Sequence, residues 1–440
     1  MAIKRIKDPE KVSTVAEDIL ARQLDVKTEN HPQKPVNITT PTTTTKSNSK
    51  QPSTTSRKRR QVQTYEPPPL FSTTVVFIFG VTIVVLANLW TPLALVFVWC
   101  AARLQRYFFR INDEPSARRR LLKEFQRKDQ LTAPLRQVPI DIKVEEAYWV
   151  NRRGMSLMTN VITPKNGRPI EAVVCFCHGY TDFPTLTRRK ELFRLVKKGI
   201  AVIMLEYEGH GRSDGMLGLI TDWDKLIDDT SDFFEQTSRH KFPGIPCFLM
   251  GESMGGAVAY CTYNRNPRAF RGVIFVCPMC KIGQDFLPPQ WVIDLFRKLA
   301  GPKGTASTLG YLPIAPSQGI DIDLSVRPIK QAMLTAFPVD YARRPRLATA
   351  RELLDVTLHI SNDLKNFEAP FLVQHGSLDR ITDPQLSKSL YEESKSTDKT
   401  LRLYEGMFHS LLCGEFDENI DLVFNDSIQW ILERTKTKQP

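Results

Sequence analysis

The sequence feature that most constrains the fold is a serine between glycines, in the stretch Gly251-Glu-Ser-Met-Gly-Gly256. An apolar run at residues 246–250, typical of a buried strand, comes directly before it, and residues 257–260 are typical of the start of a helix. A Gly-x-Ser-x-Gly sequence between a strand and a helix predicts a sharp, strained turn that holds the serine hydroxyl above a sheet edge. Because the glycines leave room for the chain to fold back, we predict that Ser253 is a nucleophile.

Apolar strands alternate with helical segments from about residue 139 onward. The expected strands are 144–150 and 155–162, which form an antiparallel pair, and then 172–177, 201–207, 247–250, 273–277, 371–374 and 400–404. Such apolar strands, alternating with helices such as the one expected at 192–198, predict a mostly parallel sheet covered by helices on both faces. Together with the serine turn, this pattern predicts an α/β-hydrolase fold over 137–440, with a cap insertion at about 285–350 where the alternation stops.

The segments before this domain differ from it in composition. Residues 1–65 are poor in aromatic residues and rich in Thr, Ser, Pro and Lys, which predicts disorder. Residues 70–102 carry no charged side chain and exceed the ~20 apolar residues that cross a bilayer. We predict a membrane anchor there, either one span kinked near Pro92 or a hairpin that returns to the same side. Basic residues flank both ends, so the positive-inside rule does not orient a single span, whereas a hairpin would keep both clusters in the cytosol. The basic residues 103–136 are typical of an amphipathic helix on lipid headgroups or of a solvated linker helix.

The positive charge of the chain, formally +12, belongs to these N-terminal segments, since residues 137–440 carry equal numbers of basic and acidic side chains. Basic clusters beside an apolar run favour anionic lipid headgroups, so we predict a membrane surface as a partner. We expect a membrane-bound protein whose hydrolase domain faces the cytosol, at the endoplasmic reticulum or a lipid droplet. Because residues 137–440 have no net charge, nucleic acid is not expected as a partner of this domain. The segment Arg57-Lys-Arg-Arg60 is, however, also typical of a nuclear signal. The eight cysteines lack zinc or disulfide spacing, which favours a reducing compartment.

A serine nucleophile requires a base and an acid, and in this fold the acid and then the histidine follow it along the chain. The strand expected at 371–374 leads into Asp379, and the strand expected at 400–404 is followed by His409. We predict that His409 takes the proton of Ser253 as general base and that Asp379 accepts the imidazole N–H.

Other residues compete for these roles. Asp383 lies four residues after Asp379, but it also precedes Pro384 and suits a helix cap. His375 precedes the acid, and His178 and His210 precede the serine, so their order in the chain is wrong for the base.

An oxyanion hole requires two backbone N–H groups near the developing negative charge. We predict that Met254, directly after the nucleophile, supplies one. Tyr180, in the loop after the strand at 172–177, is predicted to supply the other. His178 in the same loop is expected to brace the loop rather than to transfer protons.

These motifs resemble those of the monoacylglycerol lipase family of α/β-hydrolases, especially its plant-type branch with lysophospholipases and caffeoylshikimate esterases. The resemblance covers roughly residues 139–435. The matching segments are His178-Gly-Tyr180, Glu208-Gly-His-Gly-Arg-Ser-Asp214, Gly251 to Gly256, Pro278-Met-Cys-Lys-Ile282, Pro345-Arg-Leu347, His375-Gly-Ser-Leu-Asp379, Thr382-Asp-Pro384, Leu403-Tyr-Glu-Gly406 and His409. The resemblance implies ester hydrolysis through an acyl-serine intermediate, a mobile cap, and no metal or organic cofactor.

Two departures bear on the substrate. Gly218-Leu-Ile-Thr221 stands where relatives commonly have a Tyr-Ile/Val-Pro run, and the residues before 136 have no counterpart in the familiar soluble members. Our first hypothesis is a membrane-anchored serine hydrolase that cleaves monoacylglycerols or lysolipids, with apolar cap side chains at Trp291, Ile293 and Phe296. The alternatives are an esterase of small or phenolic esters and a non-catalytic membrane-tethered binding protein.

Overall fold

The structure is a computed structural model, and it describes residues 119, 137–165, 167–180, 182, 187–281, 287, 289–315 and 344–436. The predictions for residues 1–65 and 70–102, for the linker except Arg119, and for residues 285, 286, 288 and 316–343 of the cap lie outside these ranges. Within the described ranges, no helix is both long and apolar enough to cross a membrane.

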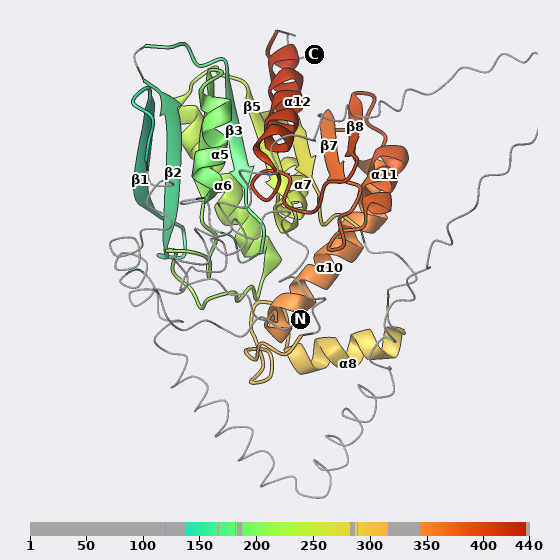
Figure 1. Ribbon diagram of the computed structural model, residues 1–440. Helices are drawn as coiled ribbons and strands as arrows, with labels where there is room; N and C mark the ends of the chain where they lie inside the picture. Colours follow the sequence, from blue (N-terminus) through green and yellow to red (C-terminus); the bar gives the residue numbers. More distant parts are fainter. Residues whose placement is uncertain are drawn as a thin grey trace, which may run out of the picture. The chain divides into compact units, whose positions relative to one another are not determined.

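Eight described strands form one sheet in the order β1-β2-β4-β3-β5-β6-β7-β8 (Figure 1). Their bounds are β1 Ile142–Val150, β2 Ser156–Pro164, β3 Ala172–Cys177, β4 Ile200–Leu205, β5 Cys247–Glu252, β6 Val273–Val276, β7 Phe371–Gly376 and β8 Lys399–Tyr404. β2 pairs antiparallel with β1 and with β4, and every other pairing in the sheet is parallel. The predicted antiparallel pair and the mostly parallel sheet are therefore confirmed.

The inner strands are buried along their whole length. All residues of β3, β4, β5, β6 and β7 are buried, which explains why these strands appear in the sequence as nearly unbroken apolar runs. The edge strands β1 and β8 contain partly exposed positions instead. A strand inside a parallel sheet needs apolar side chains on both faces, because helices cover both.

Helices cover both faces of the sheet, as the alternating pattern predicted. The described helices are α5 Thr187–Val196, α6 Trp223–Lys241, α7 Met254–Arg265, η2 Pro267–Ala269, α8 Gln290–Ala300, α10 Leu347–Asp363, η4 Leu364–Asn366, α11 Pro384–Glu393 and α12 Asp417–Thr435. α5 and α12 share one apolar cluster with the sheet, while α6, α7, α10 and α11 share another. The helix expected at 192–198 is α5, which begins and ends earlier than predicted.

The order of the strands fixes where a site can form. β3 pairs with β4 on one side and with β5 on the other, so the chain goes from β3 to β4 and then crosses back past β3 to β5. In open α/β sheets, this reversal leaves a crevice at the carboxyl ends of the strands, where ligands bind. The loops after β3 and β5 meet there, because a Cβ added to Gly179 would lie 3.5 Å from the Cβ of Ser253.

One residue from the segment before the hydrolase domain is packed onto the antiparallel edge of the sheet. The guanidinium of Arg119 forms an ion pair with Asp214 at 2.6 Å and donates a hydrogen bond to the Arg212 carbonyl at 2.8 Å. It also lies over the ring of Tyr148 in β1, 4.7 Å from the ring centre. Arg119 therefore joins the loop after β4 to the edge strand.

Aromatic rings fill the core between β6, β7 and the helix layer. Phe275 of β6 lies 5.9 Å from Phe367 and 5.9 Å from Phe371, measured between ring centres, and all three are buried. Tilted and edge-on ring pairs at this separation stabilise the fold beyond the contribution of the apolar area that they bury.

We expect Phe275→Ala to lower the free energy of unfolding by about 3–5 kcal/mol, because it removes a fully buried ring and leaves a cavity. Chemical denaturation of the full chain in detergent, followed by circular dichroism, measures this change. Ile140→Ala is the control: that side chain is 89% exposed, so the expected change is below about 0.5 kcal/mol. Equal effects of the two substitutions would contradict the assignment of Phe275 to the core.

Candidate active site

Ser253 occupies the turn between β5 and α7. Its φ of 56° is positive, which among described non-glycine residues is shared only by Cys277. Its N–H donates to the carbonyl of Val276 in β6 at 3.0 Å, and its carbonyl accepts the N–H of Gly256 at 2.9 Å. A non-glycine residue in this conformation is strained and persists only where its surroundings impose it. The strand, sharp turn and helix expected around the serine are all present.

Two glycines make this turn possible. A Cβ on Gly251 would lie 2.1 Å from the carbonyl oxygen of Gly255, and a Cβ on Gly255 would lie 2.0 Å from that of Cys177. Real Cβ atoms do not approach oxygens so closely, so only glycine fits at either position. The turn is therefore folded tightly on itself and against the end of β3.

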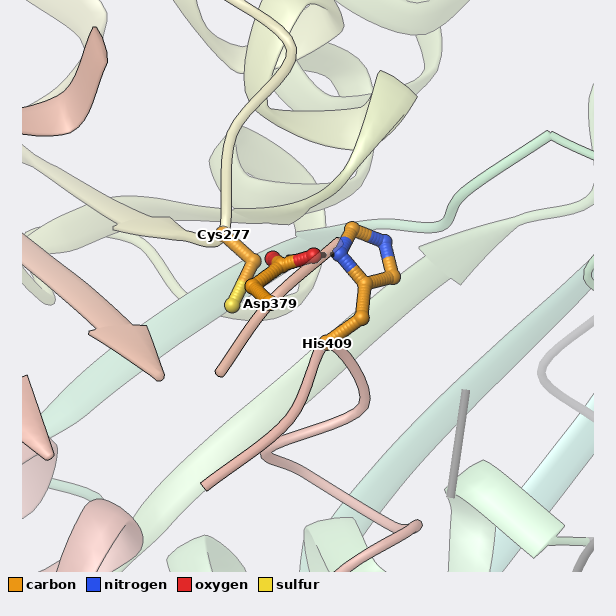
Figure 2. Close-up of side chains that lie close together, drawn as sticks. All are labelled: Cys277, Asp379 and His409. Carbon is orange, nitrogen blue, oxygen red and sulfur yellow. Dashed lines mark hydrogen bonds and ion pairs between the residues drawn. The ribbon is translucent and has the colours of Figure 1, made fainter. Parts of the chain in front are cut away.

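The structure brings Asp379 and His409 into direct contact. Asp379 follows β7 and His409 follows the neighbouring parallel strand β8, so their loops leave the sheet at the same edge. The Nδ1–H of His409 donates to Asp379 Oδ2 at 2.7 Å, and both residues are buried. Figure 2 shows the second ring nitrogen directed away from Asp379. With its hydrogen on Nδ1, the neutral ring has a free electron pair on Nε2, as a general base requires.

Asp379 accepts several further hydrogen bonds. Its Oδ2 lies 2.9 Å from His375 Nε2 and 2.8 Å from the Thr382 hydroxyl, while its Oδ1 accepts the backbone N–H groups of Ile381 and Thr382. Burial alone raises the pKa of Asp379, but the hydrogen bonds from His375 and His409 outweigh burial and hold the pKa well below its usual range. The carboxylate therefore stays ionised at neutral pH, although it is buried.

The alternative acid and base have other contacts. Asp383 is exposed and caps α11, where its side chain accepts the N–H of Gln385 at 2.9 Å. His375 has one ring nitrogen on Asp379, and its Nδ1 lies 2.6 Å from the hydroxyl of Ser387. The contact between His375 and Asp379 was not predicted. The sequence signal for it is the His-Gly-x-x-Asp spacing at the end of β7.

His178 braces the loop after β3, as expected. The ring is fully buried and stacks on Tyr207, with 3.9 Å between ring centres. Nε2 accepts the backbone N–H of Tyr207 at 3.3 Å, and Nδ1 lies 2.8 Å from the carbonyl of Gly179. Burial lowers the pKa of His178 to about 4, so the ring is neutral and Nδ1 carries the hydrogen that it donates.

The two predicted oxyanion donors lie on segments that meet at Ser253. Met254 is the first residue of α7, so its N–H belongs to the positive end of a helix dipole. Tyr180 follows Gly179, and its hydroxyl donates to the carbonyl of Gly218 at 2.8 Å, which fixes the loop. The placement suits both donors, and their role stays a prediction.

A buried ion pair next to the nucleophile was not predicted. Glu252 forms an ion pair with Arg188 of α5, whose Nε also donates to Asp182 at 2.8 Å. Burial raises the pKa of Glu252, and the guanidinium of Arg188 opposes that rise. Because a carboxylate left alone in such a place costs several kcal/mol, Arg188 holds the residue before Ser253 in position. The only sequence signal is the charged residue between Gly251 and Ser253.

Among the described residues, one group has the side chains of a metal site. Ligand atoms of Cys277, Asp379 and His409 all lie within 4.8 Å of one another, and the three residues are buried (Figure 2). Two of these three residues are the predicted acid and base.

Comparison with known proteins agrees with this arrangement. Residues 168–417, which include Ser253, Asp379 and His409, match the Hydrolase_4 family, described as serine aminopeptidase, S33. Caffeoylshikimate esterase of Arabidopsis thaliana is 33% identical over 297 residues, which cover 67% of this chain and 87% of that protein. Monoglyceride lipase of Homo sapiens is 28% identical over 314 residues, which cover 69% of this chain and 95% of that protein.

A solved structure shares the fold. It is a soluble variant of monoglyceride lipase from Saccharomyces cerevisiae in complex with a substrate analog. The TM-score is 0.55 at 22% sequence identity, over 69% of this chain and 98% of that chain.

The lowered pKa of Asp379 predicts a contribution to acid stability. Because the folded pKa lies below the ordinary value of 3.8, the ionised carboxylate stabilises the fold above that pH, and the contribution is lost as the pH falls further. Below about pH 4, we expect the unfolding free energy of the wild type to fall by up to ~1.4 kcal/mol per pH unit more than that of Asp379→Asn. Denaturation at stepwise lower pH measures both slopes. Asp383→Asn, at an exposed helix cap, serves as the control, and parallel slopes for wild type and Asp379→Asn would refute the expectation.

Proposed function

Because this chain belongs to the serine aminopeptidase S33 family, in its monoacylglycerol lipase-like branch of α/β-hydrolases, and is a serine ester hydrolase, we propose that it cleaves monoacylglycerols or lysolipids at a membrane surface. The observation that carries the proposal is the buried Asp379–His409 hydrogen bond at the sheet edge where Ser253 stands on its strained turn. We assign the roles of acid, base and nucleophile to Asp379, His409 and Ser253 on this basis.

The proposed reaction gives each of these groups one role. Nε2 of His409 takes the hydroxyl proton of Ser253 as the serine oxygen attacks the ester carbonyl. The negative charge that develops on the carbonyl oxygen is stabilised by the N–H groups of Met254 and Tyr180. His409 then gives its proton to the departing alcohol, which leaves an acyl group on the serine. Water, activated by the same histidine, releases the acid and restores the enzyme.

Asp379 contributes through its fixed charge. The imidazolium that forms on His409 during the reaction is positive and buried, so a carboxylate in contact with Nδ1 stabilises it. The hydrogen bonds from Thr382 and His375 keep that carboxylate ionised and oriented. Asp379 therefore acts without taking up a proton itself.

The cap helix supports a lipid surface as the place of action. Trp291, Leu295 and Leu299 lie four residues apart on one face of α8 and are 59%, 44% and 41% exposed. An apolar stripe of this kind on a helix suits burial at the boundary of headgroups and acyl chains. Two of the three cap side chains named from the sequence do not lie on this stripe: Ile293 is buried, and Phe296 packs on the cluster beneath the helix.

The membrane anchor and the location are part of the proposal and rest on the sequence. The uncharged run at 70–102, with basic residues on both sides, supports a protein held in a membrane with its hydrolase domain in the cytosol. The surface of the endoplasmic reticulum or of a lipid droplet is where such an enzyme would meet dissolved monoacylglycerols. The described cysteines are all free thiols, which agrees with a reducing compartment.

A second candidate function is the hydrolysis of small or phenolic esters by the same residues. The observation in its favour is that the Arabidopsis caffeoylshikimate esterase is 33% identical to this chain, while the human monoglyceride lipase is 28% identical. Family membership and the intact Asp379–His409 contact leave the third hypothesis, a non-catalytic binding protein, without support.

The substrate and the nucleophile can be tested together. Full-length protein in detergent is assayed against monoacylglycerols of increasing chain length and against phenolic esters. We expect long-chain monoacylglycerol to be the preferred substrate, and Ser253→Ala to lower its hydrolysis by at least about 10³-fold. A fluorophosphonate probe should label the wild type and the control Ser396→Ala, but not Ser253→Ala. Equal labelling of Ser253→Ala would refute the nucleophile, and preference for phenolic esters would favour the second candidate function.

The apolar stripe of α8 predicts a difference between dissolved and membrane-bound substrates. With the protein reconstituted into phosphatidylcholine vesicles, the double substitution Trp291→Ser with Leu295→Ser should weaken the contact of the cap helix with the lipid, because less apolar area enters it. Hydrolysis of monoacylglycerol in those vesicles should slow accordingly, while a soluble short-chain ester should be cleaved at the wild-type rate. Ile140→Ser, which changes an exposed apolar residue elsewhere, is the matched control. A uniform loss on both substrates would show that the stripe has a different role.

A further inference from the structure

Cys277 is a strained, buried thiol beside the proposed catalytic residues. It follows β6 with a φ of 43°, and its side chain is fully buried. Its N–H donates to the carbonyl of Gln374 at 2.8 Å, and its carbonyl accepts the hydroxyl of Thr382 at 3.1 Å. Such a backbone conformation in a non-glycine residue is costly and is found mostly at functional sites. Ester hydrolysis as proposed above gives the thiol no task.

The thiol completes a set of three metal ligands. Sγ of Cys277, a carboxylate oxygen of Asp379 and a ring nitrogen of His409 all lie within 4.8 Å of one another. Figure 2 shows the three side chains converging from separate loops, which follow β6, β7 and β8. A thiolate, an imidazole and a carboxylate are the ligands that Zn²⁺ prefers, whereas Mg²⁺ and Ca²⁺ prefer oxygen ligands alone.

We propose that Cys277, Asp379 and His409 form an inhibitory Zn²⁺ site, with water in the fourth position. Three protein ligands and one open position are common at zinc sites. Thr382, which contacts Asp379 and His409, is only half-buried, whereas the three ligands are buried.

Zinc at this site stops the reaction through the histidine. Cys277 loses its thiol proton to solvent and binds as the thiolate. Zinc takes the electron pair of Nδ1 of His409, so the hydrogen that Nδ1 carried in the neutral ring moves to Nε2. Nε2 is the atom that must accept the proton of Ser253, and with a hydrogen already in place it cannot. Zinc also replaces the hydrogen bond from His409 to Asp379 by bonds to the metal.

Inhibition is measured with the full-length chain in detergent, at free Zn²⁺ concentrations set by a chelator. The rate of ester hydrolysis is expressed relative to the metal-free rate of each variant. We expect Zn²⁺ to inhibit the wild type reversibly, and Cys277→Ser to require at least tenfold more Zn²⁺ for half-inhibition. Cys280→Ser, which removes a buried thiol three residues away, should behave as the wild type. Inhibition that is unchanged in Cys277→Ser, or no inhibition of the wild type, overturns the proposal.

A second measurement does not depend on activity. Ser253→Ala keeps all three ligands, so Co²⁺ added to this variant should give the near-ultraviolet charge-transfer absorption of a thiolate bound to cobalt. The same absorption should be missing in Ser253→Ala combined with Cys277→Ser. Failure to see the band in Ser253→Ala, or the same band in the double variant, overturns the site. Because no substrate is used, this result is separate from the success or failure of the proposed lipid-ester activity.

Discussion

The parallel pairing of β7 with β8 is the constraint on which the site depends. Their register, with Gly376 opposite Tyr404, makes the two following loops start at the same level of the sheet. Backbone hydrogen bonds then join the loops, from Ser377 to Tyr404 at 2.9 Å and from Leu378 to Met407 at 2.9 Å. A Cβ on Gly376 would lie 2.4 Å from the Met407 carbonyl oxygen, so the loops are in close contact. The backbone therefore holds the loops of Asp379 and His409 side by side, and the hydrogen bond between the two side chains joins them.

Within that frame, a single buried negative charge organises the surrounding side chains. Asp379 accepts hydrogen bonds from two imidazoles, a hydroxyl and two backbone amides. Interactions of this kind are strong in a dry interior, and they are costly to leave incomplete. The same network that keeps the carboxylate ionised also fixes the ring of His409. Stability at acid pH and orientation of the base therefore come from the same contacts.

The serine turn, the strands and the positions of Asp379 and His409 could be predicted, because each depends on a pattern of residues close together in the sequence. Gly-x-Ser-x-Gly after an apolar run located the turn at Ser253, and the apolar runs themselves located the strands. Asp379 and His409 followed from their places after two of those strands. Chain order and strand position are properties that a sequence shows directly.

What could not be predicted depends on residues that meet only in the folded chain. Arg188 reaches Glu252 from another helix, and the contact of His375 with Asp379 depends on how the loop after β7 closes. The left-handed conformation of Cys277 is imposed by neighbours from other loops. The directions of the cap side chains could not be predicted for a simpler reason. A period of 3.6 residues places Ile293 and Phe296 on the face of α8 opposite Trp291, and their apolar character alone does not show this.

If the proposed membrane anchor is correct, the contact of Arg119 with Asp214 limits the distance between that anchor and the hydrolase domain. If residues 70–102 are the anchor, the chain from 103 to 119 spans at most about 60 Å when extended, and the chain from 103 to 137 about 120 Å. A partly exposed ion pair of this kind stabilises the contact by up to about 1 kcal/mol, so the ion pair between Arg119 and Asp214 can break and form again. The hydrolase domain could then lie at two maximum distances from the anchor. The shorter one, with the ion pair formed, keeps it at the membrane surface, and the longer one applies when the ion pair is broken.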